Sequence, residues 1–307
     1  MKILSVNISE NKGTIKKPVD EIVINGSGVN NDAHSGSWHR QVSMLGMESI
    51  EKFSKEAKRK INYGEFAENI TTQGFELYKS NILDRFENEN IILEVTQIGK
   101  ECHGAACAIF KEVGNCVMPK EGIFCRVIKG GRLKAGDEII YAPKIFKIGI
   151  ITLSERASSG EYSDRSGPKV EEHISEHFSK SKRKIEISYY LIPDNSEMLK
   201  EILLENKTKK YDIIFTTGGT GIGSKDFTVD VVKTLLHKEI PGIMDYIRYK
   251  YGAEKPNALV SRSVAGIIDK TMIFTLPGSV KAVDEYMPEI NRVLNHLIYM
   301  LHDIDKH

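Results

Sequence analysis

The chain has 307 residues, about twice the roughly 150 residues of an ordinary domain, so we expect two domains. Hydrophobic residues make up 40% of it and charged residues 28%, a globular composition that excludes a disordered or fibrous chain. The formal charge is +1, and without a basic excess a general nucleic-acid binder is not expected. No apolar run reaches the roughly 20 residues of a membrane span, and residues 1–10 lack the pattern of a secretion signal. We therefore expect a cytoplasmic protein.

The first half is predicted to consist mostly of short strands. We expect these strands at residues 3–6, 91–95, 122–128 and 138–141, separated by turns rich in glycine, asparagine and lysine. One helix is expected over residues 49–60. This pattern indicates a mainly β, barrel-like domain with few helices. Pro143 interrupts the pattern after the last of these strands, so we place the first domain at residues 1–143 and the second at 144–307.

The chain has four cysteines, which fall in one stretch of the first half: Cys102, Cys107, Cys116 and Cys125. They form no CxxC pair, so a structural zinc site is weakly supported. Most free cysteines are small buried hydrophobes, and we expect that of the last three. Cys102 follows a strand and stands beside Lys100 and His103, and cationic neighbours lower the pKa of a thiol.

In the second half, strands and helices alternate. Strands are expected at residues 148–153, 185–192, 212–216 and 272–276, and helices at 167–178, 196–204 and 280–301, with a further helix starting near Thr228. This alternation predicts an α/β, doubly wound domain with a mostly parallel sheet and helices on both faces. Ligands of such sheets bind beyond the carboxyl ends of the strands. We therefore expect the chemistry in the loops that follow the strands.

The strand expected at 212–216 leads directly into a glycine-rich loop. Gly218, Gly219, Gly221 and Gly223 permit positive φ angles, so that successive N–H groups can approach one anion. The following helix would add its positive N-terminal end. Ser224 breaks the spacing of both a Walker A loop and a GxGxxG motif. A phosphate cradle and a plain tight turn both fit this pattern.

Two aspartates accompany this loop. Asp194 follows the strand expected at 185–192, and Asp226 lies at the end of the glycine loop. We expect the two preceding strands to be neighbours in the sheet, which would place both carboxylates beside the cradle. Hard oxygen ligands there suit Mg²⁺ bound to nucleotide phosphates. The alternative is that each aspartate only caps the helix that follows it.

Four motifs occur in order along the second half: IGIITLSERASSG (148–160), LIPD (191–194), TTGGTG (216–221) and LPGS (276–279). Together they resemble the MogA/MoaB-type molybdopterin-binding family, which attaches AMP to molybdopterin. The resemblance implies that Asp194 and Asp226 are the catalytic and Mg²⁺-binding residues of this transfer from ATP. It also implies that the pterin or nucleotide is bound by Ser154, Thr217, Gly218, Gly219, Thr220, Gly221, Ser261, Arg262, Pro277, Gly278 and Ser279.

The first half contains a polar loop, NDAHSGSWHRQVS (31–43). His34, His39 and Arg40 could bind an anion such as a pterin phosphate, and the alternative for each histidine is a structural role. Together with GEFAENIT (64–71), GIFCR (122–126) and GDE (136–138), this loop resembles the MOSC domain, named for the C-terminal part of molybdenum-cofactor sulfurases. The resemblance implies that Cys102, His34, His39 and Arg40 form a site that binds the cofactor or carries sulfur.

The two resemblances together imply a protein of molybdenum cofactor biosynthesis that adenylylates molybdopterin with ATP and Mg²⁺. They also imply a homo-oligomer, commonly a trimer, and a molybdenum-inserting protein that takes the product. Two alternatives stay open. One is a non-catalytic carrier of molybdopterin, and the other is a persulfide carrier at Cys102 with the second domain as a docking platform.

Overall fold

The computed structural model describes residues 1–101 and 116–304. The chain divides into two compact units, unit 1 (Met1–Lys144) and unit 2 (Ile145–His307). Each unit has its own hydrophobic core. In the part of the chain that the structure describes, no helix has the length and apolar character needed to cross a bilayer.

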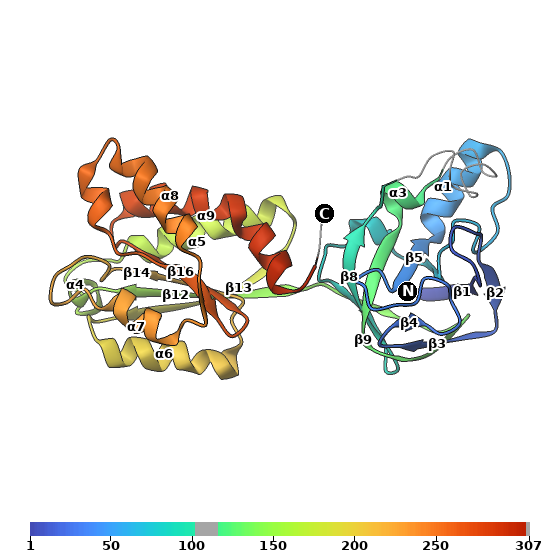
Figure 1. Cartoon of the computed structure of the whole chain (residues 1–307), viewed down its shortest axis with the longest axis horizontal. Helices are drawn as coiled ribbons and strands as arrows, with labels where there is room; N and C mark the ends of the chain where they lie inside the picture. The colour runs from blue at the N-terminus through green and yellow to red at the C-terminus, as the bar shows by residue number, and fades with distance from the viewer. Residues whose placement is uncertain (102–115, 305–307) are drawn as a thin grey trace. The chain divides into compact units, whose positions relative to one another are not determined.

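Unit 1 is mainly β (Figure 1). Its strands are β1 (Lys2–Ile8), β2 (Lys17–Val19), β3 (Glu21–Asn25), β4 (Gly28–Val29), β5 (Val42–Gly46), β6 (Ile70–Gln73), β7 (Arg85–Glu87), β8 (Ile92–Ile98), β9 (Ile123–Lys129), β10 (Gly131–Lys134) and β11 (Ile140–Ala142). Its described helices are α1 (Met47–Ala57), α3 (Met118–Glu121) and the short 3₁₀ helix η1 (Leu77–Lys79).

The strands of unit 1 form two sheets. The larger has the order β11-β7-β8-β9-β5-β6-β1-β2, and the smaller has the order β10-β3-β4. Side chains from both sheets, among them Ile22, Phe86 and Leu93, share one buried core. A closed barrel requires pairing between the first and last strands of a sheet, whereas β11 and β2 are edges of the described sheet. The mainly β prediction is therefore met, and the barrel-like description is not confirmed.

Unit 2 is an α/β structure with a mixed sheet. Its strands are β12 (Ile145–Leu153), β13 (Lys184–Ile192), β14 (Ile213–Thr217), β15 (Lys238–Glu239), β16 (Ala265–Ile268) and β17 (Thr271–Leu276). Its helices are α4 (Glu155–Ser158), α5 (Ser166–Lys180), α6 (Ser196–Lys209), α7 (Thr228–Leu235), α8 (Pro241–Gly252), the 3₁₀ helix η3 (Pro256–Val260) and α9 (Val280–Leu301). The sheet order is β13-β12-β14-β17-β16-β15. The first four strands pair in parallel, and β16 and β15 add an antiparallel edge.

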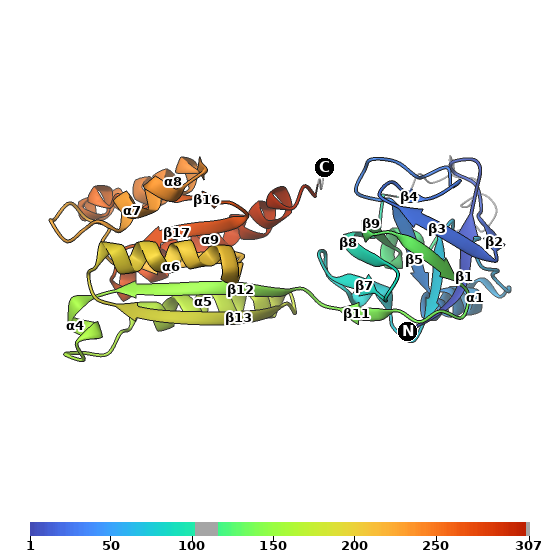
Figure 2. The same cartoon turned by 90° about the horizontal axis from the view of Figure 1, so that it is seen from below.

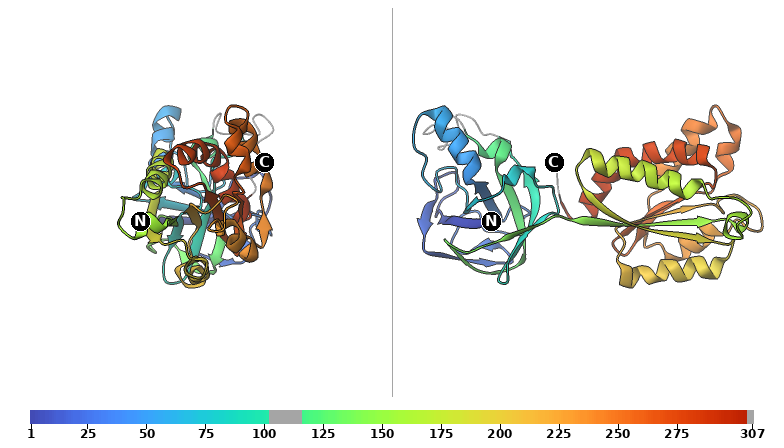
Figure 3. Two further views of the ribbon diagram at one scale, coloured as in Figure 1. Left: turned by 90° about the vertical axis from the view of Figure 1, so that its left-hand side faces the viewer. Right: turned by 180° about the vertical axis from the view of Figure 1, so that it is seen from behind.

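Helices cover both faces of this sheet, with α5, α8 and α9 on one face and α6 and α7 on the other (Figures 1 and 3). The alternation of side chains along each strand explains the two layers. Ile151 and Ile214 join the core beneath α6 and α7. Phe215 follows Ile214 in β14 and points to the opposite face of the sheet. It is also fully buried and stacks on Phe274 at a ring-centroid distance of 5.4 Å. The central strand β14 is thus buried on both faces, as is typical of parallel sheets.

The parallel strands bring four loops to one edge of the sheet. Figure 2 shows β12 and β13 running side by side in the same direction toward α4. The four motifs of the second half span the ends of β12, β13, β14 and β17 and the loops that follow them. One expectation about this edge is wrong. β13 and β14 are not neighbours, because β12 pairs with both and lies between them. Since adjacent strands are about 4.8 Å apart, the strands that precede Asp194 and Asp226 are separated by about twice that spacing.

Candidate active site

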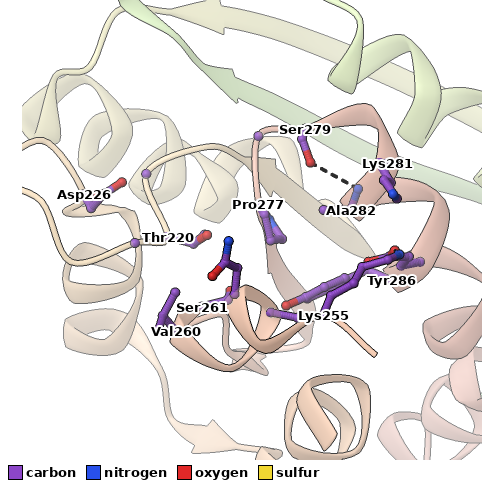
Figure 4. A pocket seen from close by; sticks show the side chains of 16 residues that line it. Thr220, Asp226, Lys255, Val260, Ser261, Pro277, Ser279, Lys281, Ala282 and Tyr286 are labelled. Carbon is purple, nitrogen blue, oxygen red and sulfur yellow. Dashed lines mark hydrogen bonds and ion pairs between the residues drawn. The ribbon is translucent and has the colours of Figure 1, made fainter. Parts of the chain in front are cut away.

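Unit 2 has a pocket of about 440 Å³ at this edge. It lies between the loops that follow β14 and β17, the first turns of α9, and the segment from α8 to η3 (Figure 4). The predicted residues that line it are Gly219, Thr220, Gly221, Asp226, Ser261, Pro277, Gly278 and Ser279. The other predicted residues, Ser154, Asp194, Thr217, Gly218 and Arg262, are not among its lining residues.

Glycine is required where the loop leaves β14. Gly218 and Gly219 have φ angles of +98° and +64°, in the left-handed region that side chains disfavour. A Cβ atom on Gly218 would lie 2.3 Å from the Leu153 carbonyl oxygen, and one on Gly219 would lie 2.3 Å from Thr228 Oγ1. The backbone of this loop therefore packs directly against β12 and α7, with no room for side chains at these positions.

Three successive carbonyl groups of the loop accept hydrogen bonds from within the protein. The Gly219 carbonyl accepts a hydrogen bond from Thr228 N at 3.1 Å. The Thr220 carbonyl accepts one from Arg262 N at 2.9 Å, and the Gly221 carbonyl one from Arg262 Nε at 2.6 Å. In a planar trans peptide the carbonyl and the next N–H point in opposite directions. The N–H groups of residues 220–222 therefore point away from these partners.

These N–H groups form a row of unused donors. Among the residues that the structure describes, no atom accepts a hydrogen bond from the N–H groups of residues 219–222, and three of these four residues line the pocket. Successive backbone N–H groups of this kind make a concave site for an anion. The same pocket meets the N-terminus of α9, where the Ser279 hydroxyl accepts from Ala282 N at 3.2 Å. The positive end of this 22-residue helix adds to the attraction for a negative group.

The charged side chains of the pocket lie at its two ends. Figure 4 shows Asp226 beside the glycine loop, and Lys255 and Lys281 with Tyr286 at the opposite side. Lys255 forms an ion pair with Glu285, which joins the α8–η3 segment to α9. The sequence reasoning missed these residues of α9 and of the segment before η3, because they belong to no motif and come together only through the packing of the helices.

Asp226 fits a cation that is shared with a substrate phosphate. Its Oδ2 accepts from Gly223 N at 2.8 Å, and its Oδ1 accepts no hydrogen bond from any described residue. No cluster of three or more potential metal ligands exists among residues 1–101 and 116–304. Mg²⁺ needs no such cluster, because it is commonly bound by one or two carboxylates together with substrate phosphates and water. The donor set at Asp226 meets that requirement.

Neither aspartate caps the helix that follows it. The N-cap residue of α7 is Phe227, and no side chain accepts a capping hydrogen bond at this helix. At α6 the cap is supplied by Asn195, whose Oδ1 accepts from Met198 N at 3.0 Å. The capping alternatives for Asp194 and Asp226 are therefore wrong. The N–H of Asp194 instead donates to Glu155 at 3.3 Å, next to Ser154, which caps α4.

A carboxylate that the sequence reasoning missed organises the strand ends beneath the loop. Asp164 accepts hydrogen bonds from the hydroxyls of Thr152, Ser166 and Tyr189 at 2.9, 2.9 and 2.6 Å. Ser166 Oγ lies 2.9 Å from Thr217 Oγ1, the last residue of β14. Burial alone would raise the pKa of Asp164. The hydrogen bonds from Tyr189, Ser166 and Thr152 lower it by more than burial raises it, so the pKa lies below its usual value. Burial and the neighbouring Asp164 raise the pKa of Tyr189 to about 12.

We expect Asp164→Asn to destabilise unit 2 by about 2 kcal/mol, the order of a lost charge-assisted hydrogen bond. Because the folded-state pKa lies below the ordinary value of about 3.9, ionised Asp164 adds stability that is present above about pH 4. This stability is lost as pH falls through the folded-state pKa, and the variant should lack this acid-dependent loss. Hydrogen exchange of α5 peptides, measured from pH 7 to pH 3, checks both effects. Trp38, the single tryptophan, lies in unit 1, so its unchanged fluorescence transition is the control.

In unit 1, His34 and Arg40 line a small pocket of about 50 Å³ together with Lys100. The guanidinium of Arg40 lies 4.7 Å from the centroid of the Trp38 ring, which holds its plane in place. The buried Nε of Arg40 has no hydrogen-bond partner among the described residues. His39 does not line this pocket. The arrangement suits one small anionic group, because three side chains that can carry positive charge meet there.

A buried ion pair holds the backbone next to this pocket. Lys16 pairs with Asp32, and each side chain is only 1% exposed. Asp32 Oδ1 also accepts from the backbone N–H of His34 at 3.0 Å. Burial would raise the pKa of Asp32, but hydrogen bonds from His34 and Lys16 hold it well below its usual range. The pair therefore fixes the backbone from which His34 reaches the pocket.

Of the cysteines, Cys125 is fully buried, and burial raises the pKa of its thiol, as a structural role requires. Cys116 is half-buried. Cys102, Cys107 and His103 lie outside the described residues.

Comparison with known families matches both units. Residues 149–296 match the family described as probable molybdopterin binding domain, and residues 31–140 match the MOSC domain. A molybdopterin adenylyltransferase of Pyrococcus furiosus is 35% identical over 162 residues, which cover 51% of this chain and 92% of that protein. A gephyrin of Dictyostelium discoideum is 33% identical over 165 residues, which cover 52% of this chain and 23% of the gephyrin.

Among solved structures, the tungsten cofactor synthesizing protein MoaB from Pyrococcus furiosus is 34% identical to this chain. The match covers 52% of this chain and 99% of that chain, with a TM-score of 0.45. The relatives named here thus correspond to about half of this chain.

Proposed function

The chain belongs to the family of the probable molybdopterin binding domain and also carries a MOSC domain, and from this we propose that unit 2 adenylylates molybdopterin in molybdenum cofactor biosynthesis. The observation that carries the proposal is the row of unused N–H donors at residues 219–222. Three of these residues line the pocket that Asp226 also lines. This arrangement places hydrogen-bond donors for a phosphate next to a carboxylate that can bind the cation accompanying that phosphate.

In the proposed reaction a terminal phosphate oxygen of molybdopterin bonds to the α-phosphorus of ATP. The bond from that phosphorus to the oxygen that bridges to the β-phosphate breaks, and pyrophosphate leaves with the bonding electrons. Such transfers ask a protein chiefly to position the groups and to neutralise charge. The N–H groups of residues 219–222 hold a phosphate, and Lys281 adds positive charge to the pocket. The charge of Lys255 is balanced by Glu285.

Asp226 would hold Mg²⁺, which when bound supplies positive charge to the phosphate oxygens. Asp194 follows β13, on the far side of β12 from the glycine loop. We therefore assign Asp194 to the nucleotide end of the site, as a second carboxylate that acts from the other side of β12. The product would pass to a molybdenum-inserting protein, and the active form would be a homo-oligomer.

Pyrophosphate release by the full chain tests the proposal. With ATP, Mg²⁺ and molybdopterin present, we expect one pyrophosphate for each adenylyl-molybdopterin found by mass spectrometry. A chain that binds molybdopterin but releases no pyrophosphate would be a non-catalytic carrier, and the proposed activity would be wrong.

For unit 1 we propose that the MOSC domain binds an anionic group of the cofactor or carries sulfur. The support is the pocket that brings His34, Arg40 and Lys100 together. Lys100 precedes Cys102 by two residues in the sequence, and positive neighbours favour the thiolate.

We expect Cys102 to react with iodoacetamide at neutral pH faster than Cys107, Cys116 and Cys125, with a labelling midpoint below the free-thiol value of about 8.5. The buried Cys125 is the internal reference for an unreactive thiol. Peptide mapping over a time course measures all four rates. Equal rates for Cys102 and the other three would remove the reactive-thiol role.

A further inference from the structure

Arg262 was expected to touch the ligand, but its guanidinium is committed elsewhere. It donates to the Gly221 carbonyl at 2.6 Å and also to the carbonyl of Asp226. Its two terminal nitrogens donate to the two carboxylate oxygens of Asp230 at 2.8 and 3.0 Å. Arg262 is not among the residues that line the pocket. The side chain therefore fastens the outside of the glycine loop to the first turn of α7.

The backbone of Arg262 completes this attachment. Its N–H donates to the Thr220 carbonyl at 2.9 Å, so one residue binds three carbonyl groups of the loop. Because the carbonyl of each trans peptide points opposite to the next N–H, turning the carbonyls of Thr220 and Gly221 toward Arg262 turns the N–H groups of Gly221 and Ile222 away from it. These are two of the unused donors.

The ion pair itself contributes little to folding. The side chain of Arg262 is 35% exposed and that of Asp230 is 60% exposed, and pairs so exposed add little to stability. The loop, however, contains Gly218, Gly219, Gly221 and Gly223, and glycine is the residue with the most backbone freedom. Without the attachment its peptide planes could rotate, and a misplacement of about 1 Å can cost about a hundredfold in rate.

We propose that Arg262, anchored by Asp230, is a positioning residue that orients the N–H donors of Gly221 and Ile222 toward a phosphate without touching it. The expected effect of Arg262 on kcat rests on the proposed adenylyl transfer. The expected effect of Arg262 on pyrophosphate affinity requires only that the loop binds a phosphate. A direct contact between Arg262 and the phosphate is the competing role. The two roles differ in what Asp230 does, because Asp230 is needed to hold the guanidinium on the loop but would hold it back from a ligand.

The experiment compares Arg262→Lys, Arg262→Gln, Asp230→Asn and the double variant Arg262→Gln with Asp230→Asn, all in the full chain. Arg292→Lys is the matched control, because Arg292 is also paired with a carboxylate, Glu289 at 3.0 Å, on the exposed side of α9. Inorganic pyrophosphate is the probe for binding, measured by calorimetry and by the amide resonance of Gly221 in protein labelled with nitrogen isotope at glycine. The kcat per folded molecule is measured separately by pyrophosphate release.

We expect pyrophosphate to shift the Gly221 amide resonance of the unaltered chain and of Arg292→Lys with equal affinity. Arg262→Gln and Asp230→Asn should each weaken pyrophosphate binding and lower kcat by about 10- to 100-fold. The double variant should lose no more affinity or kcat than the more impaired single variant, because both single changes break the same Arg262–Asp230 attachment. Arg262→Lys should lose less affinity and kcat than Arg262→Gln. Its ammonium can bond one carbonyl of the loop but lacks the forked guanidinium that bonds two carbonyls and Asp230 together.

Three results would overturn the inference: no Gly221 shift in the unaltered chain, unchanged binding and kcat in the variants, or tighter binding in Asp230→Asn with loss in Arg262→Gln. The last result would assign Arg262 to the ligand. If the variants weaken binding as expected while the unaltered chain transfers no AMP, the positioning role stands and the proposed function fails.

Discussion

Replacing Gly219 with alanine is expected to lower kcat/KM for adenylyl transfer by at least about a hundredfold while unit 2 stays folded. Gly219 has a φ angle of +64°, where a side chain costs about 1–2 kcal/mol. The added Cβ would also lie 2.3 Å from the fully buried Thr228 Oγ1. If the hydroxyl turned away, the Cβ of Thr228 would still lie 3.3 Å from the added atom. We therefore expect the loop to move, which displaces the N–H donors of residues 219–222. Pyrophosphate release and calorimetric binding of ATP measure the loss.

Gly136→Ala is the matched control for backbone strain. Gly136 has a φ angle of +97° but no atom within 4 Å of an added Cβ, and it lies in unit 1. This variant should carry a similar strain and keep full transfer activity. If Gly219→Ala binds ATP and molybdopterin as the unaltered chain does, the glycine loop is only a tight turn.

Asp226→Asn is expected to lower the rate of transfer by about 10²–10³-fold, the usual effect of removing one well-placed electrostatic contact. The fold should survive, because the asparagine oxygen can still accept from Gly223 N, as Asp226 Oδ2 does at 2.8 Å. What is lost is the negative charge that would hold Mg²⁺ on the substrate phosphates. Single-turnover rates at saturating ATP, measured over a range of Mg²⁺ concentrations, separate weaker metal binding from a slower chemical step.

Asp245→Asn is the control, since Asp245 is an exposed partner of Arg248 on α8 and lies outside the pocket lining. Asp194→Asn is the companion variant at the other side of β12. A comparable loss in Asp194→Asn supports a nucleotide that reaches across the end of β12. Near-normal rates in both aspartate variants would contradict the assignment of the acidic pair.

The local pattern of the sequence predicted most elements of unit 2 and the glycine loop. The strand expected at 148–153 is the end of β12 (Ile145–Leu153), and the helix expected at 280–301 is α9. These segments are long and strongly apolar on one or both faces, so pattern alone identifies them. β15 (Lys238–Glu239) has two exposed residues and carries no such signal. The antiparallel edge of the sheet was therefore not predicted.

What the sequence could not supply is non-local. The order of strands in the sheet depends on how the whole chain packs, and the expectation that β13 and β14 are neighbours was wrong for that reason. Lys255 and Glu285 meet across 30 residues without any motif. Asp164 had a local signal, because Ser166 and Gly167 follow it at the start of α5 and donate their N–H groups to it. The spacing of an aspartate just before a predicted helix could have identified it.

The path of the α-phosphorus of ATP tests the central claim most directly. The full chain is incubated with molybdopterin, Mg²⁺ and ATP that carries a radioactive label on the α-phosphate, and the products are separated by chromatography. We predict that the label appears in adenylyl-molybdopterin in an amount equal to the pyrophosphate released, and that Asp226→Asn slows its appearance by about 10²–10³-fold. Label that stays in ATP, or that is released as free AMP without entering the pterin, would contradict the account.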